Sequence, residues 1–381
     1  MQKVLLCGAG KIGRMITKLL AGSGDYEVTV ADFSEKALER IGKQTNVDAL
    51  RLDATSHDEL SAAMRGRDVV LSALSYHFNP LVAQVALEQG LCYFDLTEDI
   101  ETTHKVRAVS KEARPGQIFM PQCGLAPGFV SIVANALTRH FDKLDQVFMR
   151  VGALPQFPSN ALKYNLTWST DGLINEYCNS CEAIHDSERR DVLPLEGLEH
   201  FSLDGVRYEA FNTSGGLGTL CETLDGKVRE LNYKTVRYLG HRELMAFLVN
   251  DLRLSQRREI LKDILEHAIP ITLQDVVIVF CTVAGWRKGQ LVQLSDARKI
   301  YQDTIDGETW SAIQLTTAAG LCAVVDLHRE GKLPEQGFVR QEQVDLEEFL
   351  DNRFGRRYRS KISSRFVLEA GSAEEQDDAA R

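Results

Sequence analysis

The feature that most constrains the fold is a glycine-rich turn in "KVLLCGAGKIGRMITKLL", residues 3–20. A buried-strand pattern precedes the turn and an amphipathic helix pattern follows it. Gly8, Gly10 and Gly13 have the spacing G-x-G-x-x-G, which in this context is typical of dinucleotide-binding folds. The first glycine permits the tight turn, the second lets backbone amides approach a pyrophosphate, and the third lets the helix pack on the strand. The residues expected to contact the cofactor here are Gly8, Ala9, Gly10, Lys11, Ile12 and Gly13.

A second strand pattern, "YEVTVADFS", brings Asp32 to a position 19 residues after Gly13. An acidic residue at about this spacing accepts hydrogen bonds from the ribose hydroxyls of the cofactor. Phe33 and Ser34 follow it, so the next residues include no arginine that would neutralise a 2′-phosphate. We therefore expect NAD as the cofactor, with NADP as the alternative.

Strand and helix patterns continue to alternate up to about residue 99, which predicts a doubly wound parallel sheet of the α/β class. Ligands of such sheets lie beyond the carboxyl ends of the strands. This rule places Asp53 and Ala54 near the adenine, and Ala73, Leu74, Ser75 and Tyr76 near the nicotinamide. The rule also brings Asp95, Thr97 and Glu98 close to the nicotinamide. For Asp53, a turn-capping role is an equal alternative.

The pattern changes after "PQCGLAPGF", where mostly strands and hairpins follow. The segments "QVFMRVGALP", "VRYEAFNTS", "VRELNYKTVRYLG" and "DVVIVFCTVAG" indicate a largely antiparallel sheet. We expect a Rossmann domain at residues 1–125, an inserted α+β substrate domain at 126–308, and a helical segment at 309–355 that returns to the first domain. Residues 359–381 have the acidic, Ala- and Ser-rich composition of a disordered tail.

Composition excludes some partners. The net charge of −10 over 381 residues disfavours nucleic acid and anionic membranes. No apolar run approaches the ~18 residues of a membrane span, and the N-terminus has no signal-peptide pattern, so we expect a cytoplasmic protein. The eight scattered cysteines fit a reducing compartment. "CNSC" at 178–181 leaves a zinc or redox role as an alternative, but no second cysteine pair completes a metal site, and we expect no metal.

Five segments together resemble the saccharopine dehydrogenase family, over about residues 1–355. They are "KVLLCGAGKIG", "PQCGLAPGF", "NALKYNLTWSTDGLINEY", "YEAFNTSGG" and "LNYKTVRYLGH". The resemblance, strongest to short bacterial members, implies an NAD(P)-dependent enzyme that oxidises the C–N bond at the ε-carbon of the lysine skeleton and releases 2-aminoadipate 6-semialdehyde. It also implies a homodimer formed through the inserted domain.

The resemblance leaves the substrate open between lysine, as in a lysine 6-dehydrogenase, and saccharopine, as in the glutamate-forming enzyme. Shorter chain length gives a slight preference for lysine. A reductase similar to carboxynorspermidine dehydrogenase would use the same parts. A regulator that senses NAD(H) without turnover is an alternative from another class, although it would need no substrate domain.

Oxidation of a C–N bond needs a neutral amine, and therefore a base. The candidate catalytic residues are His241, Lys234, Asp95 and Tyr76, of which His241 has the best intrinsic pKa. Arg237 is suited to bidentate capture of a carboxylate. The other candidate substrate-binding residues, in "FNTSGG", are Asn212, Thr213, Ser214 and Gly215. The alternatives are that Lys234 and Arg237 are surface charges and that His241 is a structural histidine.

Overall fold

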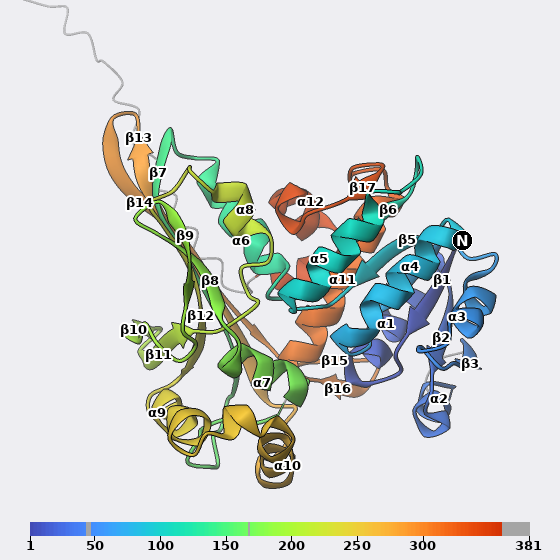
Figure 1. Cartoon of the computed structure of the whole chain (residues 1–381), viewed down its shortest axis with the longest axis horizontal. Coiled ribbons are helices and arrows are strands. Elements are labelled where there is room, and N and C mark those ends of the chain that lie inside the picture. Colours follow the sequence, from blue (N-terminus) through green and yellow to red (C-terminus); the bar gives the residue numbers. More distant parts are fainter. Residues whose placement is uncertain (43–46, 167, 360–381) are drawn as a thin grey trace, which may run out of the picture.

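The computed structural model describes residues 1–42, 47–166 and 168–359. Within these residues the chain forms two lobes, which lie side by side in Figure 1. The first lobe is built on a seven-stranded sheet with the order β17-β6-β5-β4-β1-β2-β3, and every neighbouring pair in it is parallel. The second lobe is built on an eight-stranded sheet. The predicted α/β fold with a doubly wound parallel sheet and an added α+β unit is confirmed.

The strands of the first lobe, in chain order, are β1 (Gln2–Cys7), β2 (Tyr26–Asp32), β3 (Asp48–Arg51), β4 (Val69–Ser72), β5 (Cys92–Asp95) and β6 (Ile118–Met120). Its helices are α1 (Lys11–Ala21), α2 (Glu35–Gly42), α3 (His57–Met64), η1 (Tyr76–Phe78), α4 (Asn79–Gln89) and α5 (Ile100–Ser110). Side chains of β1 alternate between two apolar layers, because Val4 and Leu6 join one core while Leu5 and Cys7 join another. A strand that is buried on both faces in this way needs helices on both sides of its sheet.

The strands of the second lobe are β7 (Lys143–Pro155), β8 (Cys181–His185), β9 (Glu188–Val192), β10 (Glu199–Leu203), β11 (Val206–Asn212), β12 (Glu230–Tyr238), β13 (Asp275–Arg287) and β14 (Gln290–Tyr301), followed by a small hairpin of β15 (Asp303–Ile305) and β16 (Glu308–Trp310). Its helices are α6 (Phe129–Thr138), α7 (Thr170–Cys178), α8 (Leu220–Leu224), α9 (His241–Ala246), η2 (Phe247–Asp251), η3 (Leu254–Gln256) and α10 (Arg258–Ala268). The sheet order is β10-β11-β12-β7-β13-β14, with β8 and β9 added beside β12. One pair differs from the antiparallel expectation, since β12 and β7 run parallel.

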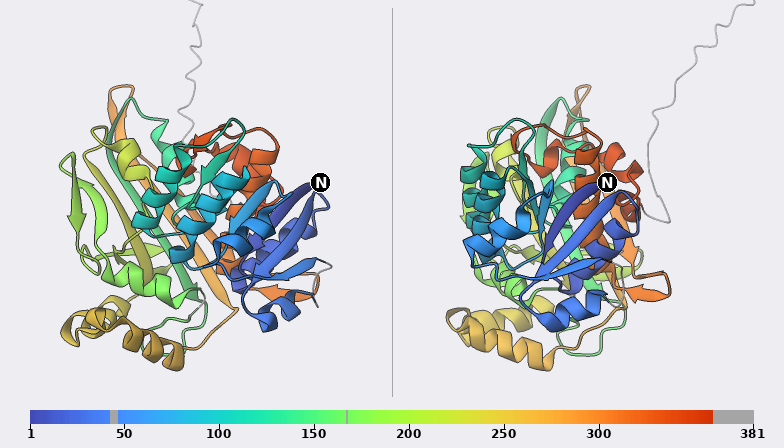
Figure 2. Two further views of the ribbon diagram at one scale, coloured as in Figure 1. Left: turned by 45° about the vertical axis from the view of Figure 1, so that its right-hand side comes forward. Right: turned by 90° about the vertical axis from the view of Figure 1, so that its right-hand side faces the viewer.

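The chain then returns to the first lobe through α11 (Ala312–Arg329), β17 (Gly337–Phe338), η4 (Gln341–Gln343), α12 (Leu346–Asp351) and η5 (Gly355–Tyr358). Helix α11 packs against α1 and also against β13, and it lies between the lobes in Figures 1 and 2. Strand β17 pairs with β6 and so extends the first sheet. One hydrophobic core therefore runs from the first sheet through α11 and α6 to the inner face of the second sheet.

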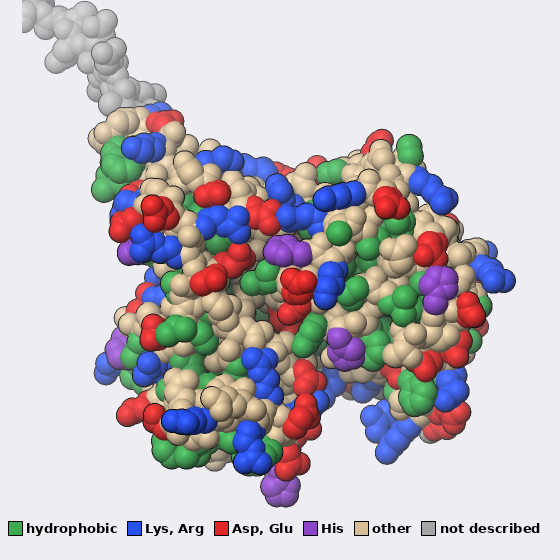
Figure 3. Space-filling view, viewed as in Figure 1, with side chains coloured by type: hydrophobic (Ala, Val, Ile, Leu, Met, Phe, Trp, Pro, Cys, Tyr) green, Lys and Arg blue, Asp and Glu red, His purple; other side chains and the backbone are tan. Residues whose placement is uncertain are grey.

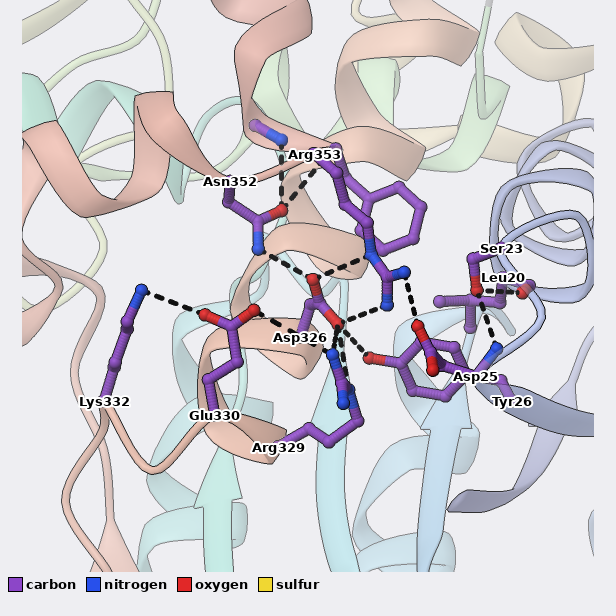
Figure 4. A network of polar contacts seen from close by, with 12 residues as sticks. Leu20, Ser23, Asp25, Tyr26, Asp326, Arg329, Glu330, Lys332, Asn352 and Arg353 are labelled. Carbon is purple, nitrogen blue, oxygen red and sulfur yellow. Dashed lines mark hydrogen bonds and ion pairs between the residues drawn. The ribbon is translucent and has the colours of Figure 1, made fainter. Parts of the chain in front are cut away.

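A buried carboxylate ties this returning segment to the first sheet (Figure 4). Asp326, in α11, accepts hydrogen bonds from Tyr26 Oη at 2.7 Å, Asn352 Nδ2 at 2.8 Å and Arg353 Nη2 at 2.8 Å. Arg353 also pairs with Asp25, which precedes β2. Because the Asp326 side chain is fully buried, these charge-assisted bonds hold its charge in place and fix the last helices to the first lobe.

Helix α10 carries Ile260, Leu261, Ile264 and Leu265 on its apolar side. Leu261 and Leu265 are buried, but Ile260 and Ile264 are about 37% and 39% exposed, because the helix packs along a narrower stripe. The predicted disordered tail lies, apart from Arg359, outside the described residues. None of the helices in the described ranges combines the length and apolarity that a bilayer crossing requires.

Candidate active site

The glycine-rich turn has the geometry that a dinucleotide needs. Gly8 has φ of +108°, and a Cβ there would lie 2.8 Å from the Ala73 carbonyl oxygen. A Cβ on Gly13 would lie only 1.9 Å from the Gly8 carbonyl oxygen, so α1 packs against the turn as closely as glycine allows. Gly10 faces open space, and no side chain caps the first turn of α1. The free amides of this helix N-terminus therefore fit a pyrophosphate.

Asp32 lies at the end of β2, beside this turn. Its Oδ2 accepts a hydrogen bond from the Ala9 amide at 2.7 Å, and its Oδ1 accepts one from the Ser34 amide at 2.8 Å. A carboxylate offers about four acceptor sites. Each oxygen of Asp32 therefore keeps capacity for a ribose hydroxyl.

The structure also brings an arginine to this position, which the sequence order did not reveal. Arg51, at the end of β3, is the strand partner of Asp32. Its guanidinium carbon lies 4.8 Å from the centroid of the Phe33 ring, and that ring is 62% exposed. The residues that follow Asp32 in the sequence include no arginine, but the neighbouring strand places Arg51 beside Asp32.

The other predicted cofactor residues follow the ends of β3 and β4. Ala73 and Leu74 pass directly beneath Gly8, as the close approach of Gly8 to the Ala73 carbonyl shows. Asp53 instead makes the turn after β3, because its Oδ1 accepts hydrogen bonds from the Thr55 amide and hydroxyl. These bonds lower the pKa of Asp53. Ala54 is buried beside it. The turn-capping alternative for Asp53 therefore describes its observed contacts.

The two lobes meet where the "FNTSGG" segment approaches the end of β5. A Cβ on Gly215 would lie 2.4 Å from the Glu98 carbonyl oxygen, and a Cβ on Gly218 would lie 3.0 Å from Gln122 Oε1. Glycine at position 215, where φ is +87°, lets the second lobe come into backbone contact with the first. The space-filling view shows the surface hollowed where the lobes meet, with acidic side chains at its rim (Figure 3).

Two carboxyl groups meet at this junction. Glu98 follows β5 and is half-buried. Its Oε1 lies against Gly172 of α7, at 2.9 Å from the position of a Cβ, and the Trp168 ring covers the same glycine. Glu176 comes one helical turn after Gly172 and therefore shares its face of α7. The charge of Glu98 acts on Glu176, so the two carboxyl groups lie near each other, one on each lobe.

Burial changes the acidity of both groups. It raises the pKa of Glu98 to about 7, and the negative charges of Asp99, Asp95 and Asp171 act in the same direction. Burial raises the pKa of Glu176 to about 8; the charge of Arg237 opposes this rise, whereas that of Glu98 adds to it. Two neighbouring carboxyl groups of this kind titrate as a pair. Near neutral pH the raised pKa values keep protons on these groups that ordinary carboxyl groups would have lost.

Arg237 faces the same junction from β12, and a chain of hydrogen bonds holds it. Its Nε donates to Tyr177 Oη at 3.0 Å, and its Nη2 lies 3.9 Å from Glu176 Oε2. The guanidinium also lies over the Tyr164 ring, at 4.8 Å from the centroid. Its Nη1 donates to the Val236 carbonyl at 2.9 Å, and the side chain is only 4% exposed, so these partners fix the guanidinium in place.

His241 stands at the far end of this chain. Its Nδ1 lies 2.8 Å from the Leu162 carbonyl oxygen, which can only accept, so Nδ1 carries the proton. Its Nε2 then accepts from Tyr177 Oη at 2.9 Å. Burial, together with the charge of Arg237, lowers the pKa of His241 to about 3. Both ring nitrogens are used, and the ring stays neutral. This does not fit the predicted catalytic base, and it fits a residue that positions Tyr177 and Arg237.

Lys234 does not belong to the junction, which corrects the expectation that it works beside Arg237. Residues three apart on a strand point to opposite faces of the sheet. Arg237 lies on the face that contacts Tyr177 of α7, whereas Lys234 Nζ donates to the Gly197 carbonyl at 2.6 Å and pairs with Glu199 at 3.2 Å. Asn212 is the strand partner of Lys234, and its amide donates to the Leu193 carbonyl on that same outer face. Neither side chain can contact a substrate held between the lobes.

Two further predicted binding residues do face inward. Thr213 Oγ1 lies 2.7 Å from Thr235 Oγ1, on the face of β12 that carries Arg237. The Ser214 amide donates to the Glu176 carbonyl at 3.0 Å and thereby fixes the segment to α7. Together with Gly215, they remain candidate substrate-binding residues.

The expected catalytic role of Asp95 does not fit the structure, because its carboxylate is fully buried and held by three hydrogen bonds inside the first lobe. It accepts hydrogen bonds from Tyr93 Oη at 2.6 Å and from the amides of Thr97 and Gln122. Burial raises its pKa to about 6, against the effect of these bonds. This carboxylate shapes the end of β5 and does not face the substrate. Tyr76 is half-buried in η1, just after β4, and remains a candidate on the cofactor side.

Sequence reasoning missed the roles of Glu176, Tyr177 and Tyr164. One signal could have found Glu176, since it follows Gly172 by four residues and so shares its side of a short helix in "STDGLINEY". Glu98 was expected near the nicotinamide but without a role. The "CNSC" cysteines, Cys178 and Cys181, are both free thiols.

Fold and site together define an NAD(P)-dependent oxidoreductase with a dinucleotide-binding lobe and a second lobe that completes the site. Residues 4–120 match the family model of the saccharopine dehydrogenase NADP binding domain, and residues 124–356 match that of the saccharopine dehydrogenase C-terminal domain. The chain belongs to the saccharopine dehydrogenase family, which confirms the resemblance seen in its sequence.

Curated relatives and a solved structure agree with this family membership. The NADP(+)-dependent, L-glutamate-forming saccharopine dehydrogenase of Saccharomyces cerevisiae is 24% identical over 324 residues, which cover 81% of this chain and 70% of that enzyme. The mitochondrial alpha-aminoadipic semialdehyde synthase of Bos taurus is 25% identical over 184 residues, 45% of this chain and 19% of that protein. The apo structure of the S. cerevisiae saccharopine dehydrogenase (L-Glu forming) matches with a TM-score of 0.76 at 18% identity, covering 92% of this chain and 97% of that one.

Proposed function

We propose that this protein oxidises the C–N bond at the ε-carbon of the lysine skeleton, with lysine itself as the preferred substrate and 2-aminoadipate 6-semialdehyde as the product. The observation that carries this proposal is that Arg237 lies beside Glu176 on the second lobe and that the charge of Glu98, from the first lobe, also acts on Glu176. In this proposal the two carboxyl groups accept the substrate ammonium and Arg237 binds the substrate carboxylate.

The balance of charges supports lysine over saccharopine. Lysine has one carboxylate and a cationic side-chain amine, whereas saccharopine has three carboxylates. Beside the two carboxyl groups of Glu98 and Glu176, Arg237 supplies a single positive charge. Extra substrate carboxylates beside Glu98 and Glu176 would add like-charge repulsion in a poorly solvated place. Lys234, which could have balanced them, lies on the outer face of the sheet.

The glycine-rich turn and Asp32 would hold the dinucleotide, whose nicotinamide supplies the hydride acceptor when bound. We expect NAD to be preferred, because the Asp32 carboxylate accepts ribose hydroxyls and repels a 2′-phosphate. Arg51, at the end of β3 and stacked on Phe33, is the group that would accommodate NADP. The balance between repulsion by Asp32 and attraction by Arg51 sets the ratio of the affinities for NAD and NADP.

The test supplies the protein with NAD or NADP and with L-lysine or saccharopine, and follows cofactor reduction together with the released amine. Lysine oxidation releases ammonia, and saccharopine cleavage releases glutamate. We expect ammonia from lysine at a higher kcat/KM than glutamate from saccharopine. Efficient glutamate release would reassign the substrate, and tight NAD binding without any reduction would favour a sensor.

A further inference from the structure

We propose that Glu98 is the catalytic base that accepts the proton of the substrate amine, and that Glu176 is the partner carboxyl that holds the second proton of the pair. This inference rests on the proposed function. It assigns the base that sequence reasoning had sought in His241, Lys234 or Asp95.

Position is the first argument for Glu98. The residue lies in the loop after β5, at the carboxyl end of the sheet, where ligands of such folds bind. Strand β5 pairs with β4, whose continuation, Ala73 and Leu74, passes beneath the glycine-rich turn. A base at position 98 therefore lies on the cofactor lobe, beside the expected nicotinamide position, and its Oε1 lies against Gly172 of the other lobe.

Availability is the second argument. The carboxylate of Asp95 is taken by three hydrogen bonds, both ring nitrogens of His241 are engaged, and Lys234 lies on the other sheet face. Glu98 is half-buried, and its carboxylate makes no hydrogen bond or ion pair with another side chain among the described residues. A general base must come within hydrogen-bond distance of the proton that it accepts.

Glu176 supplies an independent observation. Its Oε2 is buried without a hydrogen-bond partner, and Arg237 Nη2 approaches it only to 3.9 Å. A buried polar atom without a partner is costly unless a ligand or a water completes it. This oxygen shares the face of α7 on which Glu98 rests. A substrate ammonium placed between the two carboxyl groups would satisfy it.

The groups around the pair set its protonation. Asp95, Asp99 and Asp171 act on Glu98 from β5, its following loop and α7, while Arg237 acts on Glu176 from β12. Burial raises both pKa values, to about 7 for Glu98 and about 8 for Glu176. A pKa of about 7 lies near the operating pH, as an efficient base requires, so a substantial share of Glu98 is ionised at neutral pH.

The chemistry balances as follows. The Glu98 carboxylate takes a proton from the ε-ammonium, which leaves a lone pair on nitrogen. That pair forms the C=N bond as the hydride leaves the ε-carbon for oxidised NAD(P), so the substrate loses two electrons and the cofactor gains them. Water then adds to the iminium carbon and loses one proton to solvent. The hydroxyl proton of the carbinolamine passes to nitrogen, the C–N bond breaks to release ammonia and the aldehyde, and Glu98 returns its proton to solvent.

Matched isosteric variants of the two carboxyl groups test this assignment. Glu98→Gln should lower kcat with lysine about 100-fold or more and remove the acidic limb from the pH profile of the residual kcat/KM. Glu176→Gln keeps the base, so its kcat should fall about 10-fold or less and its pH profile should retain the acidic limb. If Glu98 only stabilised the fold, Glu98→Gln would reduce the active fraction without changing the profile. A larger loss in Glu176→Gln, or an unchanged limb in Glu98→Gln, would overturn the assignment.

A binding measurement provides a readout without turnover. Calorimetry with the reduced cofactor present compares lysine with norleucine, which has the same skeleton but no side-chain amine. The wild type should prefer lysine, and Glu98→Gln should lose most of this preference while cofactor affinity stays unchanged. If Glu98→Gln keeps the full preference for lysine over norleucine, Glu98 does not contact the substrate amine. If the wild type neither binds nor oxidises lysine, the proposed function fails instead.

Discussion

The buried carboxyl of Glu176 makes the stability of the free protein depend on pH in a way that one substitution can isolate. Its pKa rises from 4.5 to about 8 on folding, mainly through burial. The folded state thus binds a proton that the unfolded state releases, and the wild type loses stability as pH rises through this window. Glu176→Gln has no proton to lose. The variant should therefore gain stability relative to the wild type between pH 5 and pH 9.

The size of this gain follows from the same values. The difference between about 8 and 4.5, at about 1.4 kcal/mol for each pH unit, sets a ceiling of about 5 kcal/mol. An unfolding entropy of about 2.1 cal/mol/K per residue gives about 0.8 kcal/mol/K for 381 residues. The ceiling of about 5 kcal/mol then corresponds to a rise of about 6 °C in the melting temperature, and a smaller gain of about 3 kcal/mol corresponds to a rise of about 4 °C.

Calorimetric melting of both proteins at pH 5 and pH 9 measures this gain. The exposed Glu335 provides the control, because Glu335→Gln should show the same offset from the wild type at both pH values. A Glu176→Gln offset that is equal at pH 5 and pH 9 would refute the raised pKa. An offset that turns against the variant as pH rises would mean that the ionised Glu176 stabilises the fold through Arg237.

Three further outcomes are expected. Arg237→Lys should raise the KM for lysine about 10- to 100-fold, the equivalent of about 1.5–3 kcal/mol for a lost charged hydrogen bond, and leave NAD affinity unchanged. Lys234→Met should leave the KM for lysine nearly unchanged. Equal effects of the two substitutions in steady-state kinetics would contradict the placement of Lys234 and Arg237 on opposite faces of the sheet. Asp32→Ala should weaken NAD far more than NADP in calorimetric titrations, and equal losses would remove its role at the ribose. Asp326→Asn should destabilise the fold by about 3–5 kcal/mol at neutral pH. Burial acts to raise the Asp326 pKa, but hydrogen bonds from Arg353, Tyr26 and others lower it overall, so the difference in denaturant unfolding should shrink as pH falls below about 4; a constant difference would contradict the ionised network.

Local patterns in the sequence were sufficient to predict the first lobe. Gly8, Gly13 and Asp32 occupy positions that one strand–turn–helix unit defines within a short stretch of chain, and the structure gives them the expected contacts. Alternating strands and helices then permit few topologies, so the parallel sheet followed. The motifs of the second lobe indicated its family but not the directions of its side chains.

The candidate site was harder to predict because it joins residues from distant segments. Lys234 and Arg237 are three residues apart on one strand, so their side chains point to opposite faces of the sheet. Their closeness in the sequence nevertheless suggested that both bind the same anionic substrate. Glu98 and Glu176 meet only because α7 packs onto the loop after β5. Asp95 looked like the exposed acid of that loop, yet three hydrogen bonds turn its carboxylate inward. Arg51 reaches Asp32 across strands. Each of these contacts depends on tertiary packing.

Deuterium transfer measures the position of oxidation most directly. Lysine that carries deuterium at carbon 6 is incubated with the protein and the oxidised cofactor, and the mass of the reduced cofactor is determined. If the site between Arg237 and the Glu98–Glu176 pair holds lysine as proposed, the reduced cofactor gains one deuterium from this substrate and none from lysine deuterated at carbon 2. Label from carbon 2, or reduction without label from either carbon, would contradict the proposal.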